Sequence, residues 1–185
     1  MKIHNLIEAA QDTLIRRPTT KDLLPEEKWE KIGQNINPEF DLYSEKLGVF
    51  HSLFAVIGDK PVAKWTYLYS EGRSPIRVDI GCQVVSSKGI YASQPGYMFH
   101  LFKFMLDNHI AILGDTAQSK DAIGFYKKLA RFYPVAAYTQ SKIYPLDLET
   151  FTFERNGKKY GLWDKGPDNS LVQILVAPKN IDLNV

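Results

Sequence analysis

The side chains best suited to nucleophilic or metal chemistry are the single cysteine and the four histidines. A thiol with a lowered pKa would allow covalent transfer through Cys82, but we interpret this small residue in an apolar run as a buried strand position. The histidines show neither the His-Glu-x-x-His spacing nor the clustering with acids that indicates a metal. We therefore predict no metal site, and this prediction covers His4, His51, His100 and His109.

Composition is that of an ordinary globular protein. Of the 185 residues, 44% are hydrophobic and 24% charged, which suits one core and predicts a single domain over residues 1–185. The 23 basic and 21 acidic residues give a net charge of +2, too even a balance to indicate a nucleic-acid partner by itself. Because no apolar run resembles a signal peptide or a membrane span, we expect a cytoplasmic protein with no membrane partner.

Periodicity along the chain predicts the elements that must position any reactive group. Helices are expected where apolar residues recur every three or four positions, and strands where β-branched and aromatic residues alternate or form short apolar runs. The turn formers at residues 58–61 and 156–157 predict two hairpins. Residues 34–48 fit no pattern, and residues 89–96 are expected to be a connection. The expected order is helices at 3–15 and 25–33, strands at 49–57, 62–69 and 76–85, a helix at 97–109, a strand at 110–115, a helix at 119–132, and strands at 134–144, 148–154, 158–163 and 171–176.

The stretch ILGDTAQSKDAIGFYKKLARF resembles a strand and helix of the GCN5-related N-acetyltransferase (GNAT) superfamily. The family's helix reads Asn-x-x-Ala-x-x-Phe-Tyr-x-x-Leu-Gly-Phe, and the hairpin FAVIGDKPVAKWTYL extends the resemblance to about residues 49–133. The alternative is that the matching residues are only the core face of a helix. Ser119 stands at the asparagine position, Ala122, Phe125, Tyr126 and Leu129 match, Ala130 replaces the glycine, and Phe132 lies one position late.

This resemblance implies a fold of the α/β (α+β) class. The expected architecture is a mixed, mostly antiparallel central sheet flanked by helices, with two parallel strands, residues 76–85 and 110–115, splayed at the centre. The chain is a divergent example, and a phage or mobile-element accessory protein is one interpretation of it.

The resemblance departs most at the loop that binds the pyrophosphate of the cofactor. The family's Gly-rich pattern fits SSKGIYASQPGYM in no register, and Pro95 removes one backbone donor. Gly96 is the best candidate for close approach to a phosphate, because glycine and a helix N-terminus together suit an anion. The residues that the resemblance assigns to the cofactor, acetyl-CoA, are Val84, Val85, Gln94, Gly96, Tyr97, Ser119 and Phe125.

Direct attack of an amine on the thioester of acetyl-CoA is the reaction that the resemblance implies. Tyr126 corresponds to the tyrosine that faces the leaving thiolate, so it is the candidate general acid; its alternative role is a packed helix aromatic. Asp79 is a candidate base acting through water, and Asp115, a second candidate, ends the next strand beside the cleft. Either carboxylate could instead be solvated or cap a helix.

The acceptor implied by this reaction is an amine on a small molecule, a peptide or a nucleobase. Because the cofactor loop is altered, a second hypothesis is a non-catalytic module of the same fold that binds a protein partner. A third is a nucleic-acid-modifying relative, which would need a basic groove. The sequence leaves the acyl group and the oligomeric state open.

Overall fold

The computed structural model describes residues 30–37, 40–58, 60–68, 78, 80–93, 96–116, 120–164 and 171–183. The expected helix at residues 3–15 lies outside these ranges. The expected helix at 25–33 is wrong for its last four residues, which begin strand β1 (Glu30–Asn37). Antiparallel pairing with β2 (Phe40–Leu47) supplies backbone hydrogen bonds that outweigh the weak helical preference of this segment.

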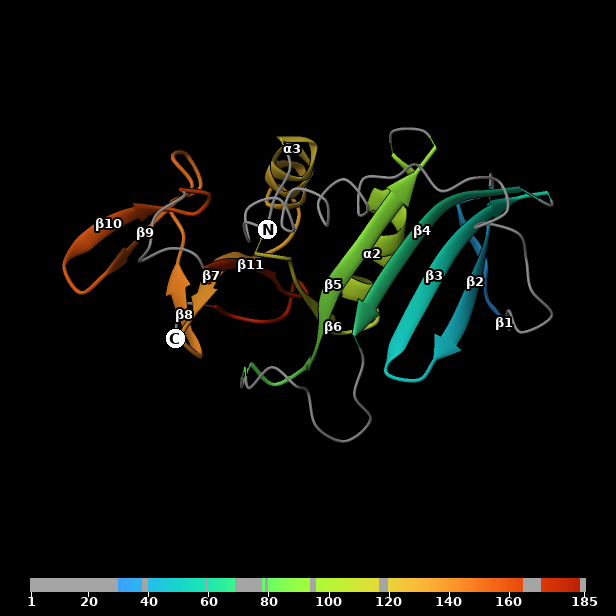
Figure 1. Cartoon of the computed structure of the whole chain (residues 1–185), viewed down its shortest axis with the longest axis horizontal. Helices are drawn as coiled ribbons and strands as arrows, with labels where there is room; N and C mark the ends of the chain where they lie inside the picture. Colours follow the sequence, from blue (N-terminus) through green and yellow to red (C-terminus); the bar gives the residue numbers. More distant parts are fainter. Residues whose placement is uncertain are drawn as a thin grey trace, which may run out of the picture.

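One large sheet organises the molecule (Figure 1). Its nine strands lie in the order β1-β2-β3-β4-β5-β6-β11-β7-β8. The first five form a continuous antiparallel meander, in which β3 (Phe50–Ile57) and β4 (Lys60–Leu68) are the predicted hairpin. The fifth strand of this meander, β5 (Gln83–Ala92), pairs antiparallel with β4.

Strand β5 begins and ends later than the sequence indicates. Residues 89–92, expected to be a connection, continue the strand and pair with β4, while only residues 83–85 of the expected strand at 76–85 belong to it. A register shift falls between the pairs Tyr67–Ser87 and Thr66–Gly89. The small residues that suggested a loop are therefore strand residues beside a bulge, where glycine is common.

A helical crossover makes the parallel pair of the sheet. Helix α2 (Tyr97–Asp107) connects β5 to β6 (Ile110–Leu113), and β6 pairs parallel with residues 83–86 of β5. Helix α3 (Lys120–Leu129) then leads to β7 (Val135–Thr139). The late strand β11 (Gln173–Val176) inserts between β6 and β7 and is antiparallel to both.

The expected strand at 134–144 is two strands rather than one. Gln140 and Ser141 have φ angles of 51° and 60°, and this turn separates β7 from β8 (Lys142–Pro145). Gln-Ser is an unusual pair for such a turn, so the sequence did not indicate it. The Asn156-Gly157 prediction is confirmed, because both residues have positive φ angles between β9 (Thr152–Arg155) and β10 (Lys158–Gly161), which form a separate two-stranded sheet.

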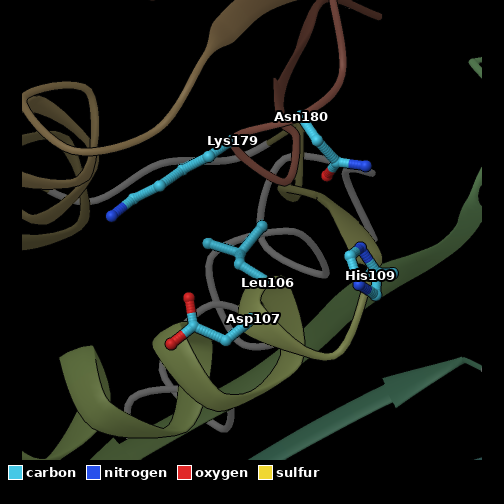
Figure 2. A pocket seen from close by; sticks show the side chains of 5 residues that line it. All are labelled: Leu106, Asp107, His109, Lys179 and Asn180. Atoms are coloured by element: carbon cyan, nitrogen blue, oxygen red, sulfur yellow. The ribbon is translucent and has the colours of Figure 1, made fainter.

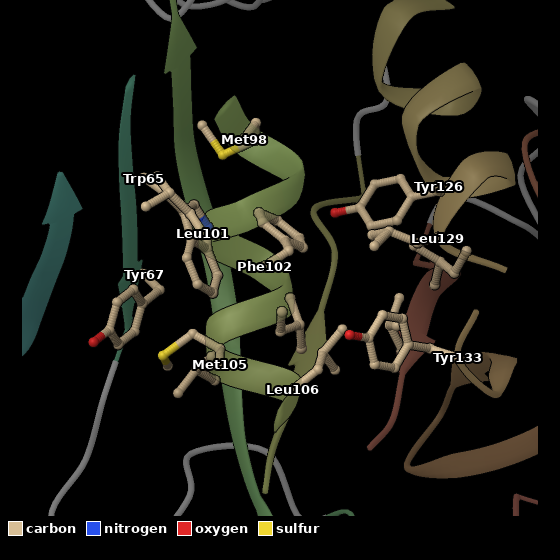
Figure 3. Packing of buried hydrophobic residues seen from close by; sticks show 14 of the residues in the cluster. Trp65, Tyr67, Met98, Leu101, Phe102, Met105, Leu106, Tyr126, Leu129 and Tyr133 are labelled. Carbon is tan, nitrogen blue, oxygen red and sulfur yellow. The ribbon is translucent and has the colours of Figure 1, made fainter. Parts of the chain in front are cut away.

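Both described helices pack on one face of the large sheet. Figure 3 shows α2 presenting Met98, Leu101, Phe102 and Met105 toward the strands, with Tyr126 and Leu129 arriving from α3. The Trp65 ring is fully buried, with its centroid 4.4 Å from that of Phe102. The opposite face carries a smaller apolar cluster: Ile80, Val84, Ala111, Leu113, Ala136, Tyr138, Leu175, Ala177 and Leu183.

These features confirm the predicted fold class. The sheet is mixed and mostly antiparallel, helices pack on it, and β5 with β6 is the one parallel pair among the described strands, at the centre of the sheet. Pairing between β5 and β6 ends at Ser86 and Leu113, although β5 runs on to Ala92. Among the described residues, no helix is long and apolar enough to cross a membrane.

Candidate functional site

The pairing of the two parallel strands ends with Ser86 and Leu113, where β6 itself ends, and β11 holds this strand end firmly. The Gly114 N–H donates to the Ile174 carbonyl at 2.8 Å. The Gln173 side-chain amide donates to the Gly114 carbonyl at 2.6 Å. Both backbone groups of Gly114 are thereby fixed by neighbouring residues of β11, so the strand end has one defined position.

Tyr126 brings its hydroxyl to this same strand end. A Cβ atom built on Gly114 would lie 2.8 Å from the Tyr126 hydroxyl oxygen and 2.8 Å from Ile174 Cγ2. The phenol therefore fills the space that any larger residue at position 114 would need. Figure 3 shows the hydroxyl pointing from α3 toward α2 and the strand beside it, rather than away from the sheet. The side chain is only 1% exposed.

Aromatic contacts fix the orientation of this phenol. The Tyr126 ring meets the Phe125 ring edge-on at 5.6 Å between centroids and the Phe102 ring at 6.3 Å. Phe125, expected to contact a cofactor, packs edge-on against Phe102 at 4.9 Å. Edge-to-face pairs of this kind resist rotation of the rings, so the hydroxyl is pre-oriented toward Gly114.

Of the other two predicted catalytic residues, Asp115 is half-buried one position beyond Gly114, and Asp79 lies outside the described residues. Asp115 Oδ1 accepts a hydrogen bond from the Thr116 N–H at 2.7 Å. Tyr126 and Asp115 thus share one end of β6. The sequence predicted both residues, but it did not indicate that both lie beside Gly114.

The residues expected to bind the cofactor fall into separate places. Val84 and Val85 are buried where β5 still pairs with β6. Gly96 is exposed and precedes α2 with a φ of 107°, and the half-buried Tyr97 ring packs edge-on against Phe40 at 5.9 Å. Gln94 and Ser119 lie outside the described residues.

Two buried serines that sequence reasoning missed lie where the pairing between β5 and β6 ends. Ser86 is the last residue of β5 that pairs with β6, and Ser87 follows it. The Trp65 indole donates to Ser87 Oγ at 2.9 Å, which fixes that side chain on the face covered by the helices. The only sequence signal for this feature was the pair of adjacent serines that follows the apolar residues of the strand.

The interpretation of Cys82 as a buried strand residue is wrong in part, because Cys82 is half-buried in a bend just before β5; its environment is still not that of a nucleophile. Burial raises the pKa of its thiol, and a backbone hydrogen bond from Ala111 offsets this only in part. A thiol with a raised pKa is mostly protonated at neutral pH and reacts slowly. Among the described residues, no group of three or more His, Cys, Asp or Glu side chains could hold a metal.

A shallow cavity of about 350 Å³ lies at the other end of β6 (Figure 2). Its lining includes Asp107 and Lys179 but none of the predicted site residues. The Tyr133 hydroxyl donates to Asp107 Oδ1 at 3.0 Å, and Lys103 forms an ion pair with Oδ2. Burial raises the pKa of Asp107, but the hydrogen bonds from Lys103 and Tyr133 prevail and lower it. This network joins α2 to the segment after α3.

We expect Tyr133→Phe to cost about 1 kcal/mol of stability at pH 7, because it removes a hydrogen bond to a carboxylate that solvent partly screens. Since the folded pKa of Asp107 is below its unfolded value, its charge stabilises the protein above that unfolded pKa, near 4, and this contribution is lost as pH falls through the folded value. The difference between the variant and the parent should therefore shrink in acid.

Urea denaturation of both proteins at pH 7 and in acid measures this difference. Tyr144→Phe is the matched control, since the Tyr144 hydroxyl makes no hydrogen bond within the described ranges. An equal loss of stability in the two tyrosine variants would contradict the assignment to Asp107.

Comparison with known proteins adds one distant likeness. No family model and no curated protein matches the sequence. Among solved structures, the chain is similar to a Bacteroides thetaiotaomicron protein that is assigned to the GNAT family as an acetyltransferase. The two are 12% identical, the match covers 74% of this chain and 65% of that one, and the TM-score is 0.38. A likeness at this level carries no argument about activity, so the fold class rests on the strand order itself.

Proposed function

We propose that the protein is an N-acyltransferase that moves an acetyl group from acetyl-CoA to an amine. The observation that carries the proposal is the position of the Tyr126 hydroxyl against Gly114, where pairing between β5 and β6 ends. The resemblance of residues 112–132 to the GNAT strand and helix assigns the same tyrosine to the leaving thiolate. Sequence pattern and side-chain direction therefore agree on one residue.

The proposed reaction needs two protein groups, an acid that protonates the leaving thiolate and a base that takes the amine proton. The amine nitrogen attacks the thioester carbonyl carbon, the carbon–sulfur bond breaks, and the Tyr126 hydroxyl gives its proton to the departing thiolate. The amine proton leaves through water to a carboxylate, for which Asp115 and Asp79 are the candidates. The phenolate recovers a proton from solvent after the products leave.

Two features of the backbone suit an acyl-CoA. Beyond Ser86, no described strand pairs with β5 on the side of β6, which leaves strand amides and carbonyls for an extended ligand with amide groups. The N-terminus of α2 has neither a side-chain cap nor an acidic residue in its first turn, and Gly96 precedes it. Such a helix end favours a phosphate.

The remaining assignments extend this proposal. Gly96, Tyr97 and Gln94 would contact the diphosphate, and Val84, Val85, Ser119 and Phe125 would complete the cofactor site. The acceptor is an amine on a small molecule, peptide or nucleobase, in the cytoplasm.

Acetyl-CoA at about a hundred times its dissociation constant should stabilise the protein by about 2.7 kcal/mol, because a ligand that binds only the native state shifts unfolding. For a chain of this size we expect the melting temperature to rise by about 5–10 °C. Acetyl-pantetheine, which lacks the diphosphate, is the control ligand and should act more weakly. No rise with acetyl-CoA at millimolar concentration would overturn the proposed function.

A further inference from the structure

A second cavity, of about 380 Å³, lies between the last turns of α3 and the loop that leads into β9. It belongs to a different part of the molecule from the candidate active site. Tyr126 points inward to Gly114, whereas its neighbour Lys127 reaches out to the aromatic side chains around the β9–β10 hairpin. The cavity is lined by Lys127, Ala130, Arg131, Leu148, Glu149 and Phe151.

A stacked aromatic pair holds one positive charge at this cavity. The rings of Phe151 and Trp163 lie 5.0 Å apart with an interplanar angle of 22°. The Lys127 ammonium lies 5.2 Å from the Phe151 centroid and 5.6 Å from that of Trp163. Cation–π attraction of this kind fixes a charge without neutralising it. Lys127 is thus held in place beside the cavity.

The loop that forms the other wall is ordered by its own hydrogen bonds. Asp147 Oδ1 accepts from the backbone N–H groups of Glu149 and Thr150, at 2.9 and 3.2 Å. The Phe151 N–H donates to the Asp147 carbonyl at 2.7 Å, and Phe151 has a φ of 54°. Bulky residues rarely adopt this conformation, so the loop presents the ring in one specific way.

Positively charged side chains outnumber negatively charged ones in the lining of this cavity. Within the described ranges, neither Lys127 nor Arg131 takes part in an ion pair. Trp163 stacks behind the lining residue Phe151, and its buried indole N–H has no hydrogen-bond acceptor among the described residues. Glu149 is the one acidic residue in the lining, which leaves a charge of +1 from two bases and one acid. A single negative charge would complete this set.

The apolar part of the lining narrows the class of ligand. Leu148 is 51% exposed, and Phe151 and the small Ala130 continue the apolar wall beside it. An inorganic anion bound to the two bases would leave these three apolar side chains exposed to water. Arginine binds a carboxylate through two parallel N–H groups, so a carboxylate carried on a ring or a branched alkyl group fits both parts.

We propose that this cavity binds an organic monocarboxylate with an aryl or branched alkyl body. Its carboxylate lies between Arg131 and Lys127, and its apolar body covers Leu148 and the edge of Phe151. This cavity is separate from the site proposed for acyl transfer, so the proposal does not depend on the binding of acetyl-CoA.

Titration of the ¹⁵N-labelled full chain with phenylacetate tests the site directly. The indole N–H signal of Trp163, assigned with Trp163→Phe, should shift and saturate, whereas that of Trp65, which is bonded to Ser87, should stay in place. Phenylacetamide, the neutral isostere, and acetate, which lacks the ring, should each bind at least about tenfold more weakly, because each loses one part of the recognition. Equal binding of phenylacetamide would overturn the role of the charge.

Variants locate the binding groups. Arg131→Gln should weaken phenylacetate binding by about tenfold or more, and Arg131→Lys should recover part of the loss, since it keeps the charge but not the paired N–H groups. Lys142→Gln, an exposed lysine on β8, is the matched control and should bind as the parent does. Equal affinities in the two glutamine variants, or no saturable Trp163 shift, would overturn the proposal. The dispersed spectrum of each variant reports that it is folded.

Discussion

Tyr126→Phe is expected to lower kcat for acetyl transfer by about a hundredfold or more, which is the usual contribution of a positioned general acid. The ring remains, so its contacts with Phe102 and Phe125 are kept and the fold should lose little stability. The KM for acetyl-CoA should change little, because the hydroxyl acts on the leaving group as the bond breaks. Steady-state kinetics with a fixed amine acceptor measures both constants.

A thioester with a more acidic thiol separates proton donation from structural damage. An aryl thioester releases a thiolate that needs no proton, so Tyr126→Phe should recover most of the lost rate with this donor. Tyr144→Phe, which removes a hydroxyl on β8, separated from β6 by β11 and β7, should leave kcat unchanged with either donor. If Tyr126→Phe transfers acetyl from acetyl-CoA at the parent rate, the phenol is only a packing residue.

Gly114→Ala is expected to cost about 1–3 kcal/mol of stability, the usual effect of forcing a methyl group into a filled core. Its Cβ would meet the Tyr126 hydroxyl and Ile174 at 2.8 Å each, and both sides are buried. Gly114 does not have a positive φ, so the glycine is needed for space and not for backbone conformation. Because the phenol must move, kcat should fall in parallel with stability.

Gly124→Ala is the matched control for this substitution. Gly124 lies in α3 with nothing within 4 Å of an added Cβ, so alanine there should stabilise the protein by about 0.5–1 kcal/mol.

The variant that combines Gly114→Ala with Tyr126→Phe tests the contact itself. Part of the stability cost of Gly114→Ala should be relieved in it, because the hydroxyl oxygen that the added methyl group would meet is gone. Chemical denaturation of the four proteins gives the coupling, and strict additivity would contradict the contact.

The sequence predicted best where one periodicity dominates. The apolar helix at 97–109, the short strand at 110–115 and the helix around Tyr126 are all confirmed, because local pattern and burial agree there. It failed at residues 89–92, where glycine and small side chains suggested a loop but belong to a bulged strand. Pairing with β4 decided that segment, and pairing is not visible in the segment itself.

The candidate site was predictable only in part for the same reason. Tyr126 and Asp115 came from one continuous motif, whereas Gly114 and Gln173 matter because β11, 59 residues later, lies beside β6. A glycine after an apolar run indicates a strand end. The neighbouring residues do not reveal that the Tyr126 phenol fills the space that a side chain at position 114 would need. Contacts between distant segments supply that information.

The insertion of β11 between β6 and β7 determines when the central part of the sheet can be completed. During synthesis, residues 110–113 and 135–139 emerge well before residues 173–176, so each presents a bare strand edge until its neighbour arrives. The hydrogen bonds that fix Gly114 are then among the last to form, and they close a long loop. Under the proposed function, a nascent chain would therefore transfer no acetyl group until β11 docks, however well its earlier hairpins have formed.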